Sequence, residues 1–215
     1  MNLKTIMRNT AITKEVQSGF TADSVLQDLL DGNKRYVDNN LTSSNVSDLV
    51  QQTTGGQFPK AVILSCIDSR VPVEMVFDQT IGDVFVARVA GNFENVDILG
   101  SMEYSCAVAG SKLVFVMGHE SCGAVKAACD GVELGNITAM LDNIVPAAKA
   151  ASEEVDGEAN SSNKAFVDKT IENNVKMTIE RIRERSKILQ EMEDNGEIKI
   201  VGGVYSLTTG KVTML

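Results

Sequence analysis

Residues 61–65 form an unbroken apolar run, Ala61-Val62-Ile63-Leu64-Ser65, and a polar segment, Cys66-Ile67-Asp68-Ser69-Arg70, follows it directly. A short continuous apolar run is typical of a parallel strand that is buried on both faces. Similar runs span residues 83–87, 112–117 and 197–202, and helical patterns lie between the runs at 95–109, 122–130, 137–151 and 164–193. This alternation predicts an α/β fold with a mainly parallel central sheet of four strands flanked by helices.

The segments outside these runs set the expected boundaries. Thr21 is a helix-capping residue, and the apolar positions after it, up to Val37, recur at helical spacing. Residues 39–58 and the acidic segment 152–163 are expected to be loops, and residues 211–214 are a candidate antiparallel edge strand. We expect a single domain over residues 21–215 and an N-terminal helical arm over residues 1–20 that packs on a dimer partner.

The composition excludes several classes of protein. The chain has 215 residues, a length that favours a single domain. Its net charge of −9 argues against binding to nucleic acid or to an anionic membrane. A hydrophobic content of 43% is enough for a packed core and excludes global disorder. No apolar run approaches the ~18 residues that a membrane helix needs.

Four cysteines are too few for a disulfide scaffold in a chain of this length. We therefore expect thiols that are free or bound to metal, in a reducing compartment. Residues 1–8 carry positive charge but no apolar segment follows them, so they do not resemble a signal peptide. The expected location is the cytoplasm, or the periplasm if an upstream signal has been removed.

The chain contains a single histidine, His119, which excludes sites that need two or three histidines. Cys66 and the segment from His119 to Cys122 both follow apolar runs, and the carboxyl ends of parallel strands meet at one edge of a sheet. Two thiols and one imidazole form a known catalytic zinc arrangement with an open fourth position. Soft thiolates favour zinc over magnesium or calcium.

Each of these residues also has a simpler interpretation. Scattered cysteines are most often small buried hydrophobic residues, which is the interpretation we prefer for Cys106 and Cys129. Asp68 and Arg70, taken alone, are a loop ion pair. Beside a metal, Asp68 can accept a hydrogen bond from metal-bound water while Arg70 keeps it ionised. If Arg70 released it, Asp68 could become the fourth ligand and close the site.

Together these segments resemble the β-class carbonic anhydrases of bacterial type. The resemblance rests on two signatures and on motifs that extend it over about residues 22–215: Cys66-x-Asp68-Ser69-Arg70-Val71-Pro72, Gly118-His119-x-x-Cys122-Gly123, Val89-Ala90-Gly91-Asn92, Gly100-Ser101-x-Glu103-Tyr104, Gly123-Ala124-Val125-Lys126-Ala127-Ala128 and Gly203-x-Tyr205-x-Leu207-x-Thr209-Gly210.

The resemblance implies one Zn²⁺ per chain on Cys66, His119 and Cys122, and reversible hydration of CO₂ to bicarbonate and a proton by zinc-bound hydroxide, assisted by an Asp68–Arg70 dyad. It also implies substrate-pocket roles for Gln57, Phe85, Tyr104 and the backbone N–H of Gly123. In the family this pocket is completed across a subunit interface, so a homodimer or a dimer of dimers is expected. Some bacterial members hold inhibitory bicarbonate in a second pocket. Here Ile63 replaces that pocket's tryptophan, although Arg88 and Tyr205 match its other members, so we expect the pocket to be absent or impaired.

Other functions remain open at this stage. Relatives with the same fold hydrolyse CS₂ or COS at the same type of zinc site, and only an assay separates them from carbonic anhydrases. A structural zinc node in a non-catalytic binding protein usually has four protein ligands, and the remaining cysteines supply no fourth. A redox protein using Cys122 would lack a CxxC pair.

Overall fold

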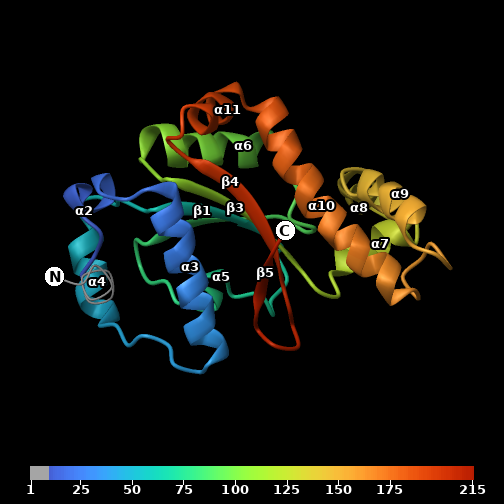
Figure 1. Ribbon diagram of the computed structural model, residues 1–215, viewed down its shortest axis with the longest axis horizontal. Coiled ribbons are helices and arrows are strands. Elements are labelled where there is room, and N and C mark those ends of the chain that lie inside the picture. Colours follow the sequence, from blue (N-terminus) through green and yellow to red (C-terminus); the bar gives the residue numbers. More distant parts are fainter. Residues whose placement is uncertain (1–9) are drawn as a thin grey trace.

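The computed structural model describes residues 10–215, which fold around a five-stranded sheet in the order β2-β1-β3-β4-β5 (Figure 1). The first four strands run parallel and β5 is antiparallel to β4, which confirms the predicted mainly parallel sheet and its edge strand. The strands are β1 (Ala61–Ser65), β2 (Val84–Arg88), β3 (Leu113–His119), β4 (Lys199–Tyr205) and β5 (Val212–Met214).

The apolar runs are continuous because the central strands are covered on both faces. Every residue of β1 and β3 is buried. Successive side chains of a strand point to opposite faces. Accordingly, Ala61 and Ile63 belong to one hydrophobic core, whereas Val62 and Leu64 belong to a second core on the other side of the sheet.

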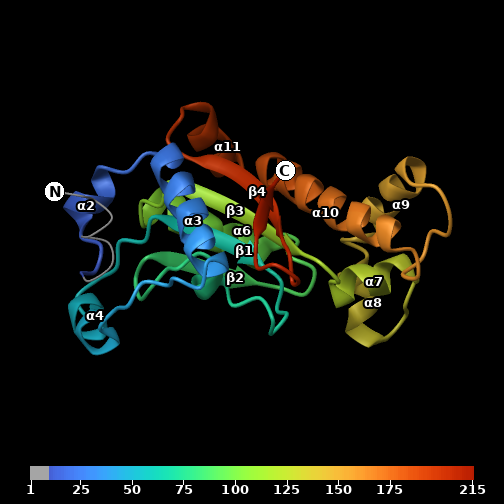
Figure 2. The same ribbon diagram turned by 60° about the horizontal axis from the view of Figure 1, so that its bottom comes forward.

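Helices cover both faces and both ends of the sheet (Figure 2). The first core includes residues of α3 and α5, and the second includes residues of α6, η1, α10 and α11. In both views α7, α8 and α9 gather beyond the carboxyl ends of the strands. The helices are α2 (Lys14–Ser18), α3 (Ala22–Val37), α4 (Val46–Thr53), α5 (Val73–Val76), α6 (Val96–Glu103), the π-helix η1 (Tyr104–Val108), α7 (Gly123–Cys129), α8 (Gly135–Leu141), α9 (Val145–Glu154), α10 (Lys164–Arg185) and α11 (Lys187–Asp194).

Two of the long predicted helices are each divided into two helices, at positions where a residue that favours a helix N-terminus occurs. The predicted helix 164–193 ends at Arg185, because the Ser186 side chain accepts a hydrogen bond from the Leu189 N–H and so caps α11. The predicted helix 137–151 is likewise two helices, and the second, α9, carries a proline in its first turn.

The interpretation of residues 39–58 as a loop throughout is wrong. Asn45 caps α4 by accepting a hydrogen bond from the Asp48 N–H, and Leu49 on this helix is buried. The segment is mostly polar because α4 lies at the surface and buries little more than one leucine. Its apolar residues Val46, Leu49 and Val50 do have helical spacing, but they cover little more than one turn, and two of them are exposed, so the pattern is too short to stand out in a polar segment.

Helix α10 lies directly on β3 and β4 because two strand residues have no side chain. A Cβ atom at Gly118 would lie 2.7 Å from Val175 Cγ2, and one at Gly202 would lie 2.5 Å from Val175 Cγ1. This close approach brings α10 over the carboxyl half of the sheet, where the candidate ligands lie.

The N-terminal arm is described only from residue 10, and residues 1–9 of the predicted arm lie outside the described residues. The Gln17 side chain of α2 donates to the carbonyl groups of Pro59 and Ala109, which ties α2 to its own subunit. Packing of the arm on a partner, and the division at residue 20, stay predictions. Across residues 10–215, no helix combines the length and apolarity needed to span a bilayer.

Candidate metal centre

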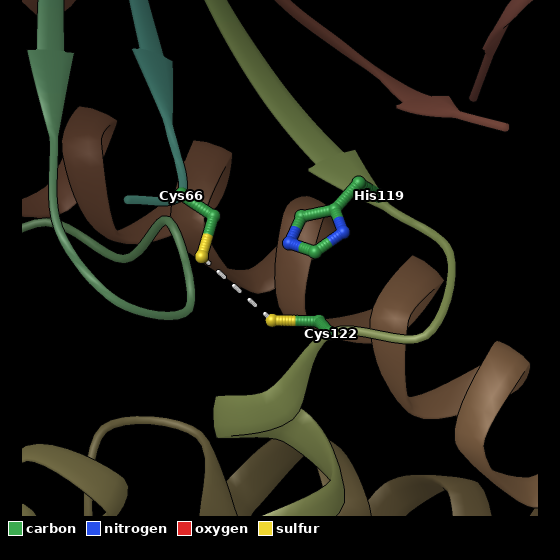
Figure 3. A group of neighbouring side chains, drawn as sticks. All are labelled: Cys66, His119 and Cys122. Carbon is green, nitrogen blue, oxygen red and sulfur yellow. Dashed lines mark hydrogen bonds between the residues drawn. The ribbon is translucent and has the colours of Figure 1, made fainter. Parts of the chain in front are cut away.

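Three side chains meet where β1 and β3 end (Figure 3). Cys66 is the first residue after β1, His119 is the last residue of β3, and Cys122 is the N-cap of α7. Because β1 and β3 are neighbouring parallel strands with Ser65 beside Met117, their ends lie side by side. One ligand atom from each of the three side chains lies within 4.8 Å of the others, so the predicted ligands converge.

A tight turn brings Cys122 back toward His119. Ser121, between them, has a φ of +53°, in the left-handed region that few residues other than glycine adopt. The Glu120 N–H donates to the Tyr205 carbonyl in β4, which continues the sheet one residue past His119. The chain then reverses at Ser121 and enters α7 at Cys122.

The imidazole of His119 is prepared to bind a cation. Its Nδ1 lies 2.9 Å from the Glu120 carbonyl oxygen, which can only accept, so Nδ1 carries the proton and Nε2 has a free lone pair. His119 is fully buried, and Nε2 has no hydrogen-bond partner among residues 10–215. A buried acceptor without a partner is destabilising. A metal ion at the centre would satisfy it, so the residues present fit a metal.

The two thiols are close enough to interact directly. Their Sγ atoms are 3.9 Å apart, and the Gly91 N–H lies 3.4 Å from the sulfur of Cys66. The hydrogen bond with Cys122 lowers the pKa of Cys66, whereas the same interaction and burial raise the pKa of Cys122. Binding of a divalent cation would displace the thiol protons and allow both sulfurs to ionise. Two thiolates and one imidazole are donors that suit zinc.

Asp68 and Arg70 form a bidentate ion pair next to the three ligands. Arg70 donates to both carboxylate oxygens of Asp68, from Nε at 3.0 Å and from Nη2 at 2.7 Å, and its backbone N–H adds a third bond at 2.9 Å. These bonds lower the pKa of Asp68 to about 2. The Oδ2 atom of Asp68 is 4.0 Å from Nε2 of His119, so an ionised carboxylate faces the position of the metal.

Arg88 holds the loop that carries Asp68. Its guanidinium donates to three backbone carbonyls, those of Cys66 at 2.9 Å, Asp68 at 2.8 Å and Val71 at 3.0 Å. From the sequence, Arg88 was expected only as a remnant of a second bicarbonate pocket. The sequence carries part of the signal for this second role, because Arg88 follows the predicted strand 83–87 directly, just as the loop follows the strand 61–65; the pairing of Arg88 with Ser65 comes from the structure.

Of the four predicted pocket residues, Gly123 lies at this centre. It follows Cys122 directly as the first residue of α7. Gln57 is exposed and precedes β1, so it lies beyond the opposite end of that strand from Cys66.

Phe85 and Tyr104 belong to a separate hollow between β2 and α6. Their rings make a T-shaped contact with centroids 6.1 Å apart. The hollow has a volume of about 760 Å³, and none of the three ligands lines it within the described part of the chain. One chain therefore does not bring Gln57, Phe85 and Tyr104 together with Cys66, His119 and Cys122.

Comparison with known proteins identifies the family of this chain. Residues 61–212 match the family model for carbonic anhydrase. Carbonic anhydrase 2 of Mycobacterium tuberculosis is 34% identical over 194 residues, which cover 86% of this chain and 89% of the relative. The β-carbonic anhydrase of Coccomyxa, solved with acetazolamide, has a TM-score of 0.70 at 26% identity and covers 88% of this chain and 86% of its own. A tetrameric β-carbonic anhydrase of Sordaria macrospora shares the fold, with a TM-score of 0.69 at 22% identity over 90% of this chain and 94% of its own.

Proposed function

The chain belongs to the β-carbonic anhydrase family, and on that premise we propose that the centre formed by Cys66, His119 and Cys122 holds one Zn²⁺ and converts CO₂ and water reversibly into bicarbonate and a proton. One observation carries the proposal. Two sulfurs and an imidazole nitrogen without a partner in the described chain converge within 4.8 Å, and the ionised Asp68 lies 4.0 Å from that nitrogen.

When bound, zinc supplies the Lewis acidity that makes water a nucleophile near neutral pH. Two thiolates neutralise the formal charge of the metal and weaken this effect, so the chain must contribute to activation of the water. Asp68 is suited to accept a hydrogen bond from the nucleophilic water and orient it toward CO₂. Arg70 keeps the carboxylate ionised and binds both of its oxygens, so Asp68 faces the centre as an ion-pair partner of Arg70 rather than as a metal ligand.

Gly123 is suited to hold the product. Its N–H is one of the unpaired donors at the start of α7, which has no side-chain cap in the described structure. A Cβ at Gly123 would meet no described atom within 4 Å, so the protein leaves space beside this residue. An anion such as bicarbonate is favoured at a helix N-terminus.

The remaining pocket residues point to a homodimer or a dimer of dimers. β2 pairs only with β1 among the described strands, so its outer edge is unpaired. The hollow beside it is lined by Phe85 and by two exposed residues, Tyr104 (53%) and Val96 (74%). A second copy on this edge would cover the apolar surface and bring Gln57, Phe85 and Tyr104 to the partner's zinc. The tetrameric relatives from Sordaria support such an assembly.

We place the protein in the cytoplasm because its four cysteines are all free. Two buried thiols that must ionise to bind zinc are best preserved in a reducing compartment.

The decisive test is CO₂ hydration by the purified protein, with zinc per chain determined on the same sample. We expect one zinc per chain and rapid hydration, and we expect Cys66→Ala to lose both. Zinc at one per chain without hydration would instead support a structural zinc protein. A parallel assay with CS₂ and COS separates the hydrolases that share this type of site.

A further inference from the structure

The turn between β2 and α6 touches the metal centre through one backbone group. The Gly91 N–H points at the sulfur of Cys66 at 3.4 Å. Gly91 and the next residue, Asn92, both have positive φ, at +82° and +42°. The direction of this N–H therefore depends on an unusual backbone conformation, and contacts with surrounding residues must stabilise that conformation.

A side chain on α10 binds the carbonyl group of Gly91. The Asn174 Nδ2 donates to the Gly91 carbonyl at 2.8 Å, and Asn174 is only 1% exposed. Its Oδ1 is buried without a hydrogen-bond partner among the residues that the structure describes. A leucine of similar size would fill the space without an unpaired oxygen, so packing alone does not account for an amide here.

A second contact fixes the same turn to the same helix. The Arg181 Nε lies 2.9 Å and 3.0 Å from the two carboxylate oxygens of Glu94, which is 1% exposed. Asn174 and Arg181 are seven residues apart, or about 10.5 Å along a helix. Gly91 and Glu94 are three residues apart in the turn, and each is bound by a different residue of α10. The helix therefore holds the turn at both points.

The turn also has little freedom on its other side. A Cβ at Gly91 would lie 2.4 Å from Cδ1 of Ile144, which precedes α9. Ile144 is fully buried in the core that contains Cys66 and Cys122. Gly91 is thus enclosed between Ile144 and Asn174, and its N–H has one direction available.

We propose that Asn174 is a positioning residue for the metal centre, acting through the Gly91 peptide group on the sulfur of Cys66. The inference rests on the proposed function, because it assumes that Cys66 binds zinc. An N–H that donates to a metal thiolate draws electron density from the sulfur and orients the ligand. Asn174 sets this interaction from α10 without touching the metal or the substrate.

The test compares two adjacent asparagines on α10. In the Asn174→Ala variant the donor to Gly91 is lost, whereas in the matched control Asn173→Ala a bond to the Glu154 side chain is lost instead. Zinc affinity is measured by chelator competition. The sulfur-to-metal charge-transfer band is measured in the Co²⁺-substituted protein, because this band reports electron donation by the thiolates directly.

We expect Asn174→Ala to bind zinc at least about 10-fold more weakly. Its cobalt band should move to lower energy, because a sulfur that loses a hydrogen bond donates more strongly. Asn173→Ala should match the wild type in both measurements. Folding of each zinc-free variant is checked by circular dichroism, and Asn174→Leu repeats the test with the side-chain volume retained.

An unchanged cobalt band and unchanged zinc affinity in folded Asn174 variants would overturn the inference, and so would equal changes in Asn173→Ala. If no Asn174 variant folds, NMR of the Cd²⁺-substituted wild type decides. A through-bond coupling between cadmium and the Gly91 amide proton supports the inference, and its absence overturns it. Failure of the wild type to bind zinc at all would overturn the proposed function itself.

Discussion

Replacement of Asp68 by asparagine tests the carboxylate beside the metal centre, because the shape is kept and one charge is removed. Asp68 accepts three N–H groups from Arg70, on two oxygens. An asparagine has one oxygen, so one of the two Arg70 side-chain donors would face an amide NH₂ group instead. The variant therefore loses both the charge and the fixed orientation of the side chain.

The expected loss of activity is large, and the expected loss of metal is none. A positioned acid–base group is worth about 10² to 10⁴-fold in rate. At 1.36 kcal/mol per factor of ten this is about 3 to 5 kcal/mol of transition-state stabilisation. Zinc should stay at one per chain, because Asp68 is not among the three converging ligands.

The assay is stopped-flow CO₂ hydration, with zinc measured on each sample. The matched control is Glu120→Gln, which removes a carboxylate next to His119 that bonds to Ser206 instead. The control should retain wild-type activity. Since Arg70 holds the pKa of Asp68 at about 2, the effect should be the same at every assay pH above about 5. Full activity in Asp68→Asn, or an equal loss in Glu120→Gln, would refute the reasoning.

Three further predictions test the core, the pH dependence and the proton path. Gly202→Ala should lower the free energy of unfolding by about 1–3 kcal/mol, because the new Cβ would lie 2.5 Å from Val175 Cγ1. In urea unfolding, the double variant with Val175→Ala should lose less stability than the sum of the two single variants. A loss equal to that sum would contradict the contact. Burial raises the pKa of Asp83 to about 6, above its unfolded value, so the folded state binds the proton more tightly and its stability should fall as pH rises from about 4 to 6. Asp83→Asn should abolish this pH-dependent change in the free energy of unfolding, which amounts to up to about 3 kcal/mol between pH 4 and 6. The same change in the variant as in the wild type would count against the prediction. Because the only histidine, His119, is at the metal centre, turnover should rise with imidazole-type buffer between about 1 and 50 mM, and a flat rate would exclude external buffer as the proton acceptor.

Much of the fold could be predicted because its strands are buried on both faces. The run 61–65 coincides with β1, and the bounds of the other runs lie within three residues of those of their strands. Helix ends were harder to predict, because they depend on single side chains that act locally. Ser186 ends one helix and starts another, and Asn45 starts a helix in a segment with little apolar content. Neither position changes the hydrophobic pattern.

The sequence alone determined the donor set of the metal centre. With one histidine available, the sequence predicts that thiolates complete the zinc site, and Cys66 and Cys122 follow predicted strands whose ends can converge at one edge of the sheet.

Only the tertiary structure decided which atoms face the metal and in which state. The Glu120 carbonyl leaves Nε2 of His119 free, and Arg70 and Arg88 hold Asp68 ionised and in place. The physical reason is that position along a strand is a local property of the chain. The direction and protonation of a side chain depend instead on the groups that folding brings against it, and Arg88 is 20 residues from the Asp68 carbonyl that it holds.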